Sequence, residues 1–182
     1  MTTGPAEPAG PLVITETPRL RLRRLTPADV GPLLAVYGDP QVTRWVGDSR
    51  PLPRADCERW VEVTHRNYAN RGYGMFAIDL RAGERAVGFC GLVHPADQPE
   101  PEIKYALRQD QWGRGLATEA ARALLTWGAA QCGLRHVIAT AAPQNEASHH
   151  VLLKIGLRRG ALRSNPDGSH TQLFAWTAPA GP

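Results

Sequence analysis

The feature that most constrains the chain is a glycine-bearing segment, Asp110–Ala121, with the sequence DQWGRGLATEAA. Before it, apolar and polar residues alternate from Glu102 to Leu107, and this period of two predicts a strand. After it, apolar residues recur at helical spacing from Ala117 to Ala129, and Gly133 is placed to end the helix. The segment is therefore predicted to be a strand-to-helix turn.

A turn of this kind is suited to binding an anion. The first N–H groups of a helix have no partner inside the helix, and the helix dipole places partial positive charge there. Gly113 and Gly115 let the backbone approach a phosphate closely, Arg114 adds a cation, and Thr118 adds a hydroxyl. The segment has neither the Gly-Lys-Ser/Thr of a P-loop nor the third glycine of the dinucleotide fingerprint. By itself it fits two interpretations, a phosphate or pyrophosphate site and a tight turn that binds nothing.

Length and composition indicate one globular domain. The chain has 182 residues, of which 42% are hydrophobic and 21% charged, and its net charge is +4. That charge suits a polyanionic small ligand and is too weak and dispersed to indicate nucleic acid. The densest basic run, RLRLRR at 19–24, alternates arginine with leucine, which predicts arginines on the solvent side of a strand. Because we find no membrane-spanning apolar run and no signal-peptide pattern, we expect a soluble, cytoplasmic protein without a membrane partner.

The cysteines and histidines give no metal or disulfide pattern. Cys57, Cys90 and Cys132 are far apart and odd in number, so we expect reduced cysteines. His149 and His150 are adjacent, and on a helix they would point about 100° apart. The other histidines lack ligand-like spacing, so we expect no metal site.

The remaining patterns predict one α/β unit. The segments 1–11 and 178–182 are rich in proline, glycine and alanine, so we expect mobile tails around a single domain over 12–177. The predicted order is strand, helices, three strands, helix, strand, helix and two strands. Thr26 and Asp29 have the spacing of a capping box at the first helix.

Four segments, taken together and in order, resemble one family. They are TPRLRLRRLTPADVGPLL, the strand EIKYAL, the loop WGRGLATEA and the later helix NEASHHVLLKIGL. Over roughly residues 15–177 the chain resembles the GNAT superfamily of acyl-CoA-dependent N-acyltransferases, and within it the RimJ/RimL-like branch. The resemblance implies an α/β (α+β) GNAT fold, with a central mixed, mostly antiparallel sheet of about six to seven strands and helices on both faces.

The resemblance implies transfer of an acetyl group from acetyl-CoA, as co-substrate, to a primary amine that attacks the thioester directly. The acceptor would be a protein N-terminus or a small-molecule amine. The sequence does not determine the oligomeric state, and a homodimer is one expectation because homodimers are common in similar proteins. A non-catalytic acyl-CoA-binding sensor or regulatory module is an alternative, favoured by Leu152, which stands where many members carry a tyrosine acid. A nucleotide-binding protein is a third alternative, and it lacks a lysine or metal-binding acid at motif spacing.

The resemblance also assigns cofactor-binding residues. Main-chain groups of Tyr105, Ala106 and Leu107 would pair with the pantetheine amides, as an added strand does. An ordinary paired strand is the alternative for these three. The loop that would hold the pyrophosphate comprises Trp112, Gly113, Arg114, Gly115, Leu116, Ala117 and Thr118. A surface role fits Arg114 equally well.

Three residues are candidates for the chemistry. Asn145 would contact the pantetheine arm, and Ser148 would orient the leaving thiolate rather than act as a simple acid. Both also fit the N-cap and first turn of a helix. Glu102 is the candidate general base, acting through water, and a solvated strand-end carboxylate is its alternative. Glu119, in the first turn of the long helix, is expected to compensate the dipole or join a buried network.

The acceptor pocket is expected between the early helices and the strand side of the cofactor. Trp45, Tyr73 and Phe76 are the aromatic candidates for it. Core or rim packing is the alternative for each, because aromatic side chains dominate cores as well as binding sites.

Overall fold

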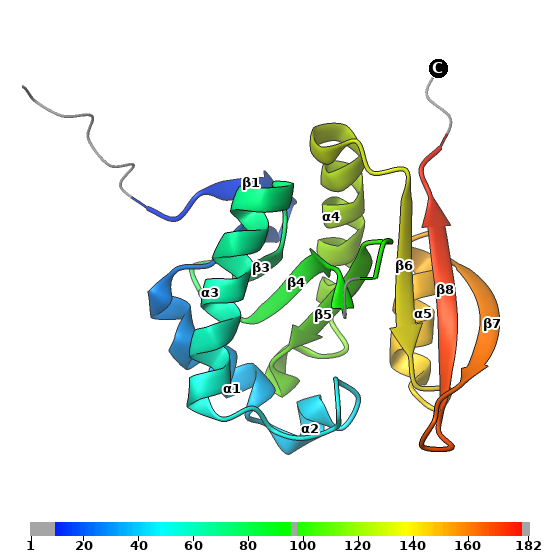
Figure 1. The fold of residues 1–182 in the computed structure, drawn as a ribbon. Coiled ribbons are helices and arrows are strands. Elements are labelled where there is room, and N and C mark those ends of the chain that lie inside the picture. Colours follow the sequence, from blue (N-terminus) through cyan, green and yellow to red (C-terminus); the bar gives the residue numbers. More distant parts are fainter. Residues whose placement is uncertain (1–9, 96–97, 180–182) are drawn as a thin grey trace, which may run out of the picture.

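The computed structural model describes residues 10–95 and 98–179. In this part of the chain one eight-stranded sheet has the order β1-β2-β3-β4-β5-β6-β8-β7. All neighbouring strands are antiparallel except β5 and β6, which are parallel. Helices cover both faces of the sheet, and the sheet divides visibly between β5 and β6 (Figure 1).

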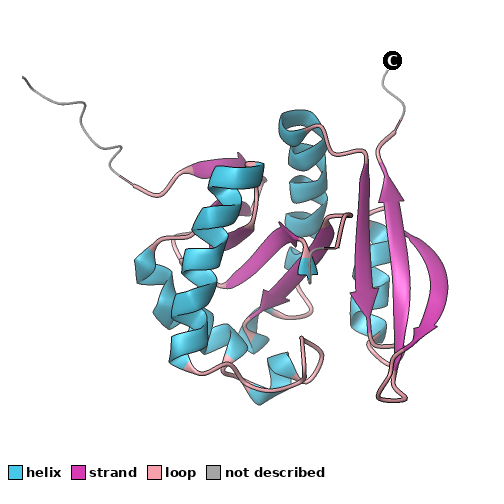
Figure 2. Ribbon diagram, in the orientation of Figure 1, coloured by secondary structure: helices cyan, strands magenta, loops and turns pink. Residues whose placement is uncertain are grey.

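The elements have the following bounds. The strands are β1 (Val13–Glu16), β2 (Leu20–Arg24), β3 (Met75–Leu80), β4 (Gly88–Val93), β5 (Glu102–Leu107), β6 (His136–Ala141), β7 (Arg158–Ser164) and β8 (His170–Thr177). The α-helices are α1 (Val30–Tyr37), α2 (Pro40–Thr43), α3 (Arg54–Arg71), α4 (Leu116–Cys132) and α5 (Glu146–Lys154). Short 3₁₀ turns, η1 (Pro27–Asp29) and η3 (Gln109–Gln111), precede α1 and the loop before α4 (Figure 2).

The sheet has one strand more than the sequence predicted, because the chain enters it as a hairpin. β1 pairs antiparallel with β2, and the Arg24 N–H donates to the Leu12 carbonyl at 2.8 Å. The turn between them is held by the Leu20 N–H, which donates to Thr17 Oγ1 at 2.9 Å. A mobile tail was predicted over 1–11, and residues 1–9 of it lie outside the described part of the chain.

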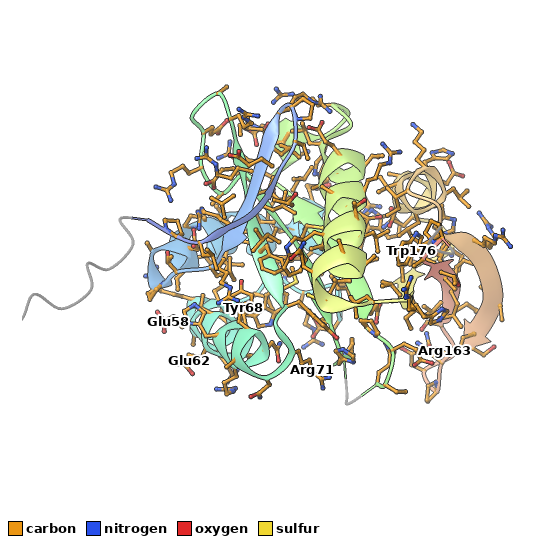
Figure 3. The ribbon with its side chains drawn as sticks, turned by 90° about the horizontal axis from the view of Figure 1, so that it is seen from above. Glu58, Glu62, Tyr68, Arg71, Arg163 and Trp176 are labelled. Atoms are coloured by element: carbon orange, nitrogen blue, oxygen red, sulfur yellow. The ribbon has the colours of Figure 1, made fainter. Side chains whose placement is uncertain are left out.

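Alternation along the strands builds a core on each face of the sheet. Phe76 and Ile78 on β3 face the cluster formed with α4 and α5, whereas Met75 and Ala77 face the cluster formed with α1 and α3. α4 buries a stripe at helical spacing, which is Leu116, Ala120, Ala121, Leu124, Leu125 and Gly128. The outer side of α3 is charged, and Glu58 and Glu62 point away from the sheet (Figure 3).

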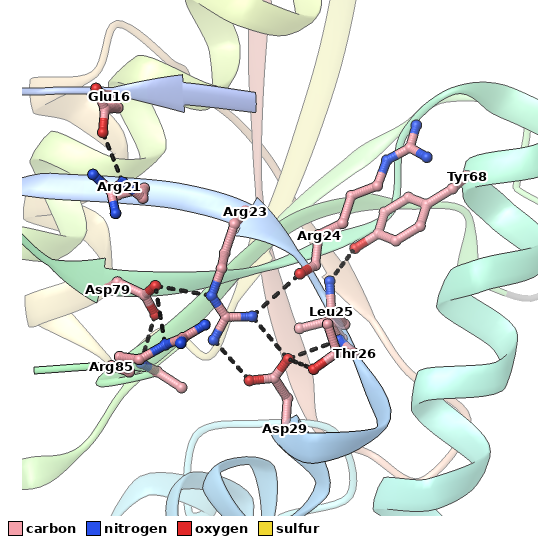
Figure 4. A network of polar contacts seen from close by, with 11 residues as sticks. Glu16, Arg21, Arg23, Arg24, Leu25, Thr26, Asp29, Tyr68, Asp79 and Arg85 are labelled. Atoms are coloured by element: carbon pink, nitrogen blue, oxygen red, sulfur yellow. Dashed lines mark hydrogen bonds and ion pairs between the residues drawn. The ribbon is translucent and has the colours of Figure 1, made fainter. Parts of the chain in front are cut away.

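One arginine of the basic run is buried, against the prediction that the run decorates the surface. Arg23 is 2% exposed, and it contacts Asp29 Oδ1 and Oδ2 at 2.8 Å each and Asp79 Oδ2 at 2.8 Å (Figure 4). Asp29 also accepts from the Thr26 N–H at 2.7 Å, as the predicted capping box requires. The prediction was wrong for Arg23 because two carboxylates, Asp29 six residues away and the distant Asp79, compensate its charge in the interior.

The network ties β2 to β3 and to η1, the turn that leads into α1. Burial acts to raise the pKa of Asp29, but the hydrogen bonds from Arg23 and Thr26 outweigh it and hold that pKa below its usual value. A carboxyl whose folded pKa is depressed stabilises the fold above its unfolded pKa, and this contribution is lost as the pH falls through the folded pKa.

None of the helices in the two described ranges is both long enough and apolar enough to cross a bilayer.

Asp29→Asn should lower the free energy of unfolding by about 3–5 kcal/mol, because it leaves Arg23 buried with one carboxylate fewer. Urea unfolding at pH 7 measures the loss. Glu16→Gln is the matched control, since Glu16 pairs with Arg21 in solvent, at side-chain exposures of 42% and 46%, and should change little. Equal losses in the two variants would contradict the assignment.

The same variant should change the pH dependence of stability. Above about pH 4 the free energy of unfolding of wild type should exceed that of Asp29→Asn. The two free energies should converge as the pH falls below the depressed pKa of Asp29. Urea titrations between pH 7 and pH 2.5 test this. A difference that stays constant over that range would show that Asp29 does not titrate with the unfolding transition.

Candidate active site

The site begins where the sheet opens. β5 and β6 share a single register pair, Glu102 with Ile138, and the Ile138 N–H donates to the Pro101 carbonyl at 2.9 Å. Beyond this point the two strands separate (Figure 1). β6 is paired along its whole length with β8 on the other side, so the opening is bounded by two intact half-sheets.

The opening leaves one edge of β5 free. The Arg108 N–H donates to the Val87 carbonyl at 3.0 Å, so the Leu107 carbonyl in the same peptide points away from β4. Alternation in an antiparallel ladder then directs the N–H and C=O of Tyr105 to the free edge, and those of Ala106 to β4. Of the three residues predicted to offer main-chain groups, Ala106 is therefore already paired, and this part of the prediction was wrong.

Trp112 occupies the end of this free edge. Its indole N–H donates to the Leu107 carbonyl at 2.9 Å, while 44% of the residue remains exposed. The side chain thus fixes the loop against the strand that precedes it. What remains unpaired at the edge by this alternation is the main chain of Tyr105 and the Leu107 N–H.

The loop before α4 presents unpaired amides. Within the described residues, no N–H group of residues 113–118 donates to a protein acceptor, and the first amide bonded back into the helix is Glu119, to Gly115 O at 3.1 Å. Gly113 and Gly115 both have positive φ, at 72° and 73°, a backbone region that disfavours side chains. Amides at a helix N-terminus form an anion site by geometry and by the helix dipole.

An acid network holds this loop from behind. Glu119 accepts from Thr17 Oγ1 at 2.6 Å and from Arg19 Nε at 2.6 Å, and Arg19 Nη1 donates to the Arg114 carbonyl at 2.8 Å. Burial acts to raise the pKa of Glu119, but these hydrogen bonds hold it below its usual value. Glu119 is therefore a network acid, as predicted.

Arg114 is directed away from the groove, which is one of the two interpretations that the sequence left open. Its guanidinium donates to Gln111 Oε1 at 2.5 Å, and the residue is not among those that line the groove. The surface alternative therefore describes Arg114 in this structure. The loop offers main-chain dipoles rather than a side-chain cation.

These features line one groove of about 2020 Å³. It runs past the free edge of β5, the loop at 113–118 and the start of α5. The α2–α3 side, with Trp45, and the β7–β8 turn, with Asp167, enclose its other parts. Met75 on β3, His94 after β4 and Lys104 on β5 also line it. A groove with a helix N-terminus on one side and an open edge on the other can hold a long ligand with an anionic group.

At the start of α5 the two predicted polar residues lie together. Asn145 is the N-cap, and its Oδ1 accepts from the Ser148 N–H at 3.2 Å. The Ser148 hydroxyl lies 2.8 Å from the hydroxyl of Tyr105, and both residues line the groove. The cap interpretation is confirmed for Asn145, while a role toward a ligand remains a prediction for both.

Glu102 is less accessible than a strand-end carboxylate in solvent. It is 3% exposed and accepts hydrogen bonds from Lys104 Nζ, at 2.5 Å, and from Thr140 Oγ1. Lys104 and Thr140 line the groove, and Glu102 lies behind them. The solvated alternative was therefore wrong, and a role as base requires a path through these two residues.

Of the three aromatic candidates for an acceptor pocket, only Trp45 lines the groove. It is 37% exposed, with the Arg44 guanidinium 4.7 Å from its ring. Tyr73 is buried and its hydroxyl contacts Nε2 of His94, the residue that reaches the groove instead. The assignments of Tyr73 and Phe76 to the pocket were wrong.

Phe76 is displaced by alternation. Its ring is fully buried on the α4 face, 5.3 Å from the ring of Tyr68 and 5.4 Å from that of Trp127. Its neighbour Met75 points to the other face and lines the groove. A strand places consecutive side chains on opposite faces, and the sequence did not reveal which face holds the groove.

Sequence reasoning missed the side chain of Tyr105 and the pair of Lys104 with Thr140. Tyr105 was considered only for its main chain, although the period of two already placed it opposite Glu102 and Lys104. The residue separations to Ser148 and Thr140 are 43 and 36, and no local pattern reports contacts of that kind.

Comparisons with known proteins identify the class. A family model described as an acetyltransferase (GNAT) domain matches residues 19–158. The uncharacterized protein YkkB of Bacillus subtilis (strain 168) is 34% identical over 147 residues, which cover 78% of this chain and 83% of YkkB. A crystal structure of an acetyltransferase from Agrobacterium tumefaciens str. C58 has a TM-score of 0.77 and 28% identity, covering 98% of this chain and 100% of that one.

A further solved structure shows the same fold with a ligand. RimL, the ribosomal L7/L12 alpha-N-protein acetyltransferase, in complex with coenzyme A has a TM-score of 0.76 at 18% identity, covering 91% of this chain and 97% of that one. The protein described here belongs to the GNAT acetyltransferase family. It is an acyltransferase with the GNAT fold, and the family and fold class expected from the sequence are confirmed.

Asn145→Ala should destabilise the protein by about 1 kcal/mol, because the N-cap hydrogen bond to the Ser148 N–H is lost. Urea unfolding without ligand measures the change. Asn145→Asp keeps an acceptor oxygen at the helix start and should retain most of the stability. A stability of Asn145→Ala equal to that of wild type would show that the cap is dispensable.

Proposed function

We propose that this enzyme transfers the acetyl group of acetyl-CoA to a primary amine by direct attack of the amine on the thioester. One observation carries the proposal. The unpaired amides of residues 113–118 line the same groove as the free main-chain edge of β5. One ligand with a diphosphate at one end and an amide-bearing arm fits both features at once.

The groups of the chain divide the work of binding. The amides at 113–118 would receive the diphosphate, with the hydroxyl of Thr118 beside them. The free main-chain groups of Tyr105 would pair with amides of the pantetheine arm, as an edge strand pairs with an added strand. The Leu107 N–H is the remaining free donor of this edge, and such a donor stabilises negative charge that develops on a carbonyl oxygen.

The chemistry requires a neutral amine and a stabilised leaving group. As the nitrogen bonds to the acyl carbon, the carbon–sulfur bond breaks and its electron pair goes to sulfur. Ser148 lines the groove and would donate a hydrogen bond to that sulfur, and Asn145 would hold the start of α5 in place. The proton of the attacking nitrogen would pass through water to the Glu102 carboxylate by way of Thr140, whose hydroxyl bonds to it.

The acceptor would approach from the side of the groove lined by Trp45, Met75 and His94. Both a protein N-terminus and a small-molecule amine suit a primary-amine acceptor. RimL, which has the same fold, is described as acting on a ribosomal protein, and this likeness supports testing peptides beside small amines. No metal takes part in the proposed reaction.

Gly115→Glu should abolish binding of acetyl-CoA, because the side chain places a carboxylate at the anion site. Thermal unfolding measures binding, since a ligand at 100 times its Kd stabilises the fold by about 2.7 kcal/mol. Gly133→Glu is the matched control: Gly133 ends the same helix with φ 66°, against 73° at Gly115, so the backbone strain is similar. Stabilisation of Gly115→Glu by acetyl-CoA would contradict the proposed diphosphate site.

Ser148→Ala should retain acetyl-CoA binding and slow turnover by about tenfold or more, because a hydrogen bond to the developing thiolate is removed. Release of free thiol from acetyl-CoA measures turnover, with an amine identified by a screen of N-terminal peptides, polyamines, amino acids and aminoglycosides. Unchanged turnover would reduce Ser148 to a helix-cap residue. Binding of acetyl-CoA without thiol release from any amine would favour the alternative of a non-catalytic acyl-CoA sensor.

A further inference from the structure

A pair of hydroxyl groups joins the strand to the helix across the opening in the sheet. The phenol oxygen of Tyr105 on β5 lies 2.8 Å from Ser148 Oγ on α5 and 3.3 Å from the Ser148 carbonyl oxygen. Both residues line the groove. Because β5 and β6 are already apart at this level, the pair is a direct contact between the two half-sheets and their helices.

Either hydroxyl can donate in the 2.8 Å contact, and the phenol of Tyr105 is the more acidic of the two and so the stronger donor. The phenol has one hydrogen and two acceptors on Ser148, Oγ at 2.8 Å and the carbonyl oxygen at 3.3 Å, and in the proposed arrangement that hydrogen makes the shorter contact, to Oγ. Burial raises the pKa of Tyr105, so the phenol keeps its proton at neutral pH and remains a donor. The Ser148 N–H is committed to Asn145 Oδ1, which fixes the backbone of this turn. With Tyr105 donating to Ser148 Oγ, the hydrogen of Ser148 must point elsewhere.

We propose that Tyr105 is a positioning residue for Ser148, whose hydroxyl hydrogen it directs into the groove toward the sulfur that leaves coenzyme A. The inference rests on the proposed function. As the carbon–sulfur bond breaks, the sulfur gains the electron pair and accepts the hydrogen bond from Ser148. Water later protonates the thiolate, and the proton of Tyr105 stays on Tyr105.

The side chains of α5 explain why the residue that contacts the Ser148 hydroxyl comes from a strand. Leu152, one turn after Ser148, lines the groove and is a leucine, so this part of α5 brings no hydroxyl to the groove. Tyr105 reaches the start of α5 from β5 instead, and its hydroxyl contacts that of Ser148. Two hydrogen bonds in sequence polarise each other, which strengthens the second.

The test compares binding of coenzyme A with binding of desulfo-coenzyme A, which lacks the sulfur. Calorimetry at pH 9 keeps much of the thiol as thiolate, by analogy with the cysteine pKa of about 8.5. Wild type should prefer coenzyme A, and Tyr105→Phe should reduce this preference about fivefold, the size of one hydrogen bond. Ser148→Ala should reduce it as much, and the double variant should lose no more than Ser148→Ala alone.

A kinetic measurement accompanies the binding test. Tyr105→Phe should lower kcat about fivefold to tenfold and leave the KM for acetyl-CoA unchanged, because the contact concerns the leaving sulfur and not the bound ground state. Ser148→Ala tests the other half of the pair without altering β5, so the proposal remains testable if Tyr105→Phe unfolds.

Tyr68→Phe is the matched control. It removes the same phenol oxygen from a buried tyrosine that bonds to the Leu25 N–H and does not line the groove. It should lower stability and leave the preference for coenzyme A unchanged. The positioning role would be overturned if Tyr105→Phe kept the wild-type preference for coenzyme A over desulfo-coenzyme A. It would also be overturned if the losses of this preference in the two single variants added in the double variant. A wild-type protein that binds neither compound would overturn the proposed function itself.

Discussion

The structure depends on the point at which β5 and β6 stop pairing. A single register pair, Glu102 with Ile138, joins the strands, and beyond it each strand is held only from its outer side. Unpaired backbone groups inside a fold are costly, so a free edge of this kind is stable only where water or a ligand satisfies it. The opening is therefore both the weakest part of the sheet and the part that can receive an extended ligand.

Two further arrangements follow from the opening. The strand leads through Trp112 into the loop, so the amides at 113–118 face the same space as the free edge. The start of α5 comes from the opposite half-sheet and adds Asn145 and Ser148 to that space. The hydroxyl contact between Tyr105 and Ser148 then connects the two halves where backbone hydrogen bonds no longer do so. The main-chain groups that could bind a ligand and the side chains that position them thus meet at the opening between β5 and β6.

At the loop before α4 the groove faces main-chain dipoles, while the carboxylates of two ion pairs lie behind its lining. Glu119 is paired with Arg19 behind the loop, and Glu102 lies behind its partner Lys104, which lines the groove. The buried Arg23 with Asp29 and Asp79 stabilises the attachment of the first helix, away from the groove (Figure 4). A desolvated carboxylate placed directly at an anion site would oppose binding, whereas one that fixes a neighbouring arginine supports the loop.

The sequence by itself determined the local parts of this protein. Glycines at 113 and 115 with helical spacing after them predicted the loop and α4, and the run from Asn145 to Ser148 predicted a capped α5, because turns, caps and periodicity are properties of neighbouring residues. Tertiary structure decided what alternation and distance leave open. It buried Arg23 between two carboxylates, turned Phe76 into the core and Met75 into the groove, and brought Tyr105 to Ser148. These outcomes depend on which face of a strand another element covers, and that is fixed only when segments far apart in sequence pack together.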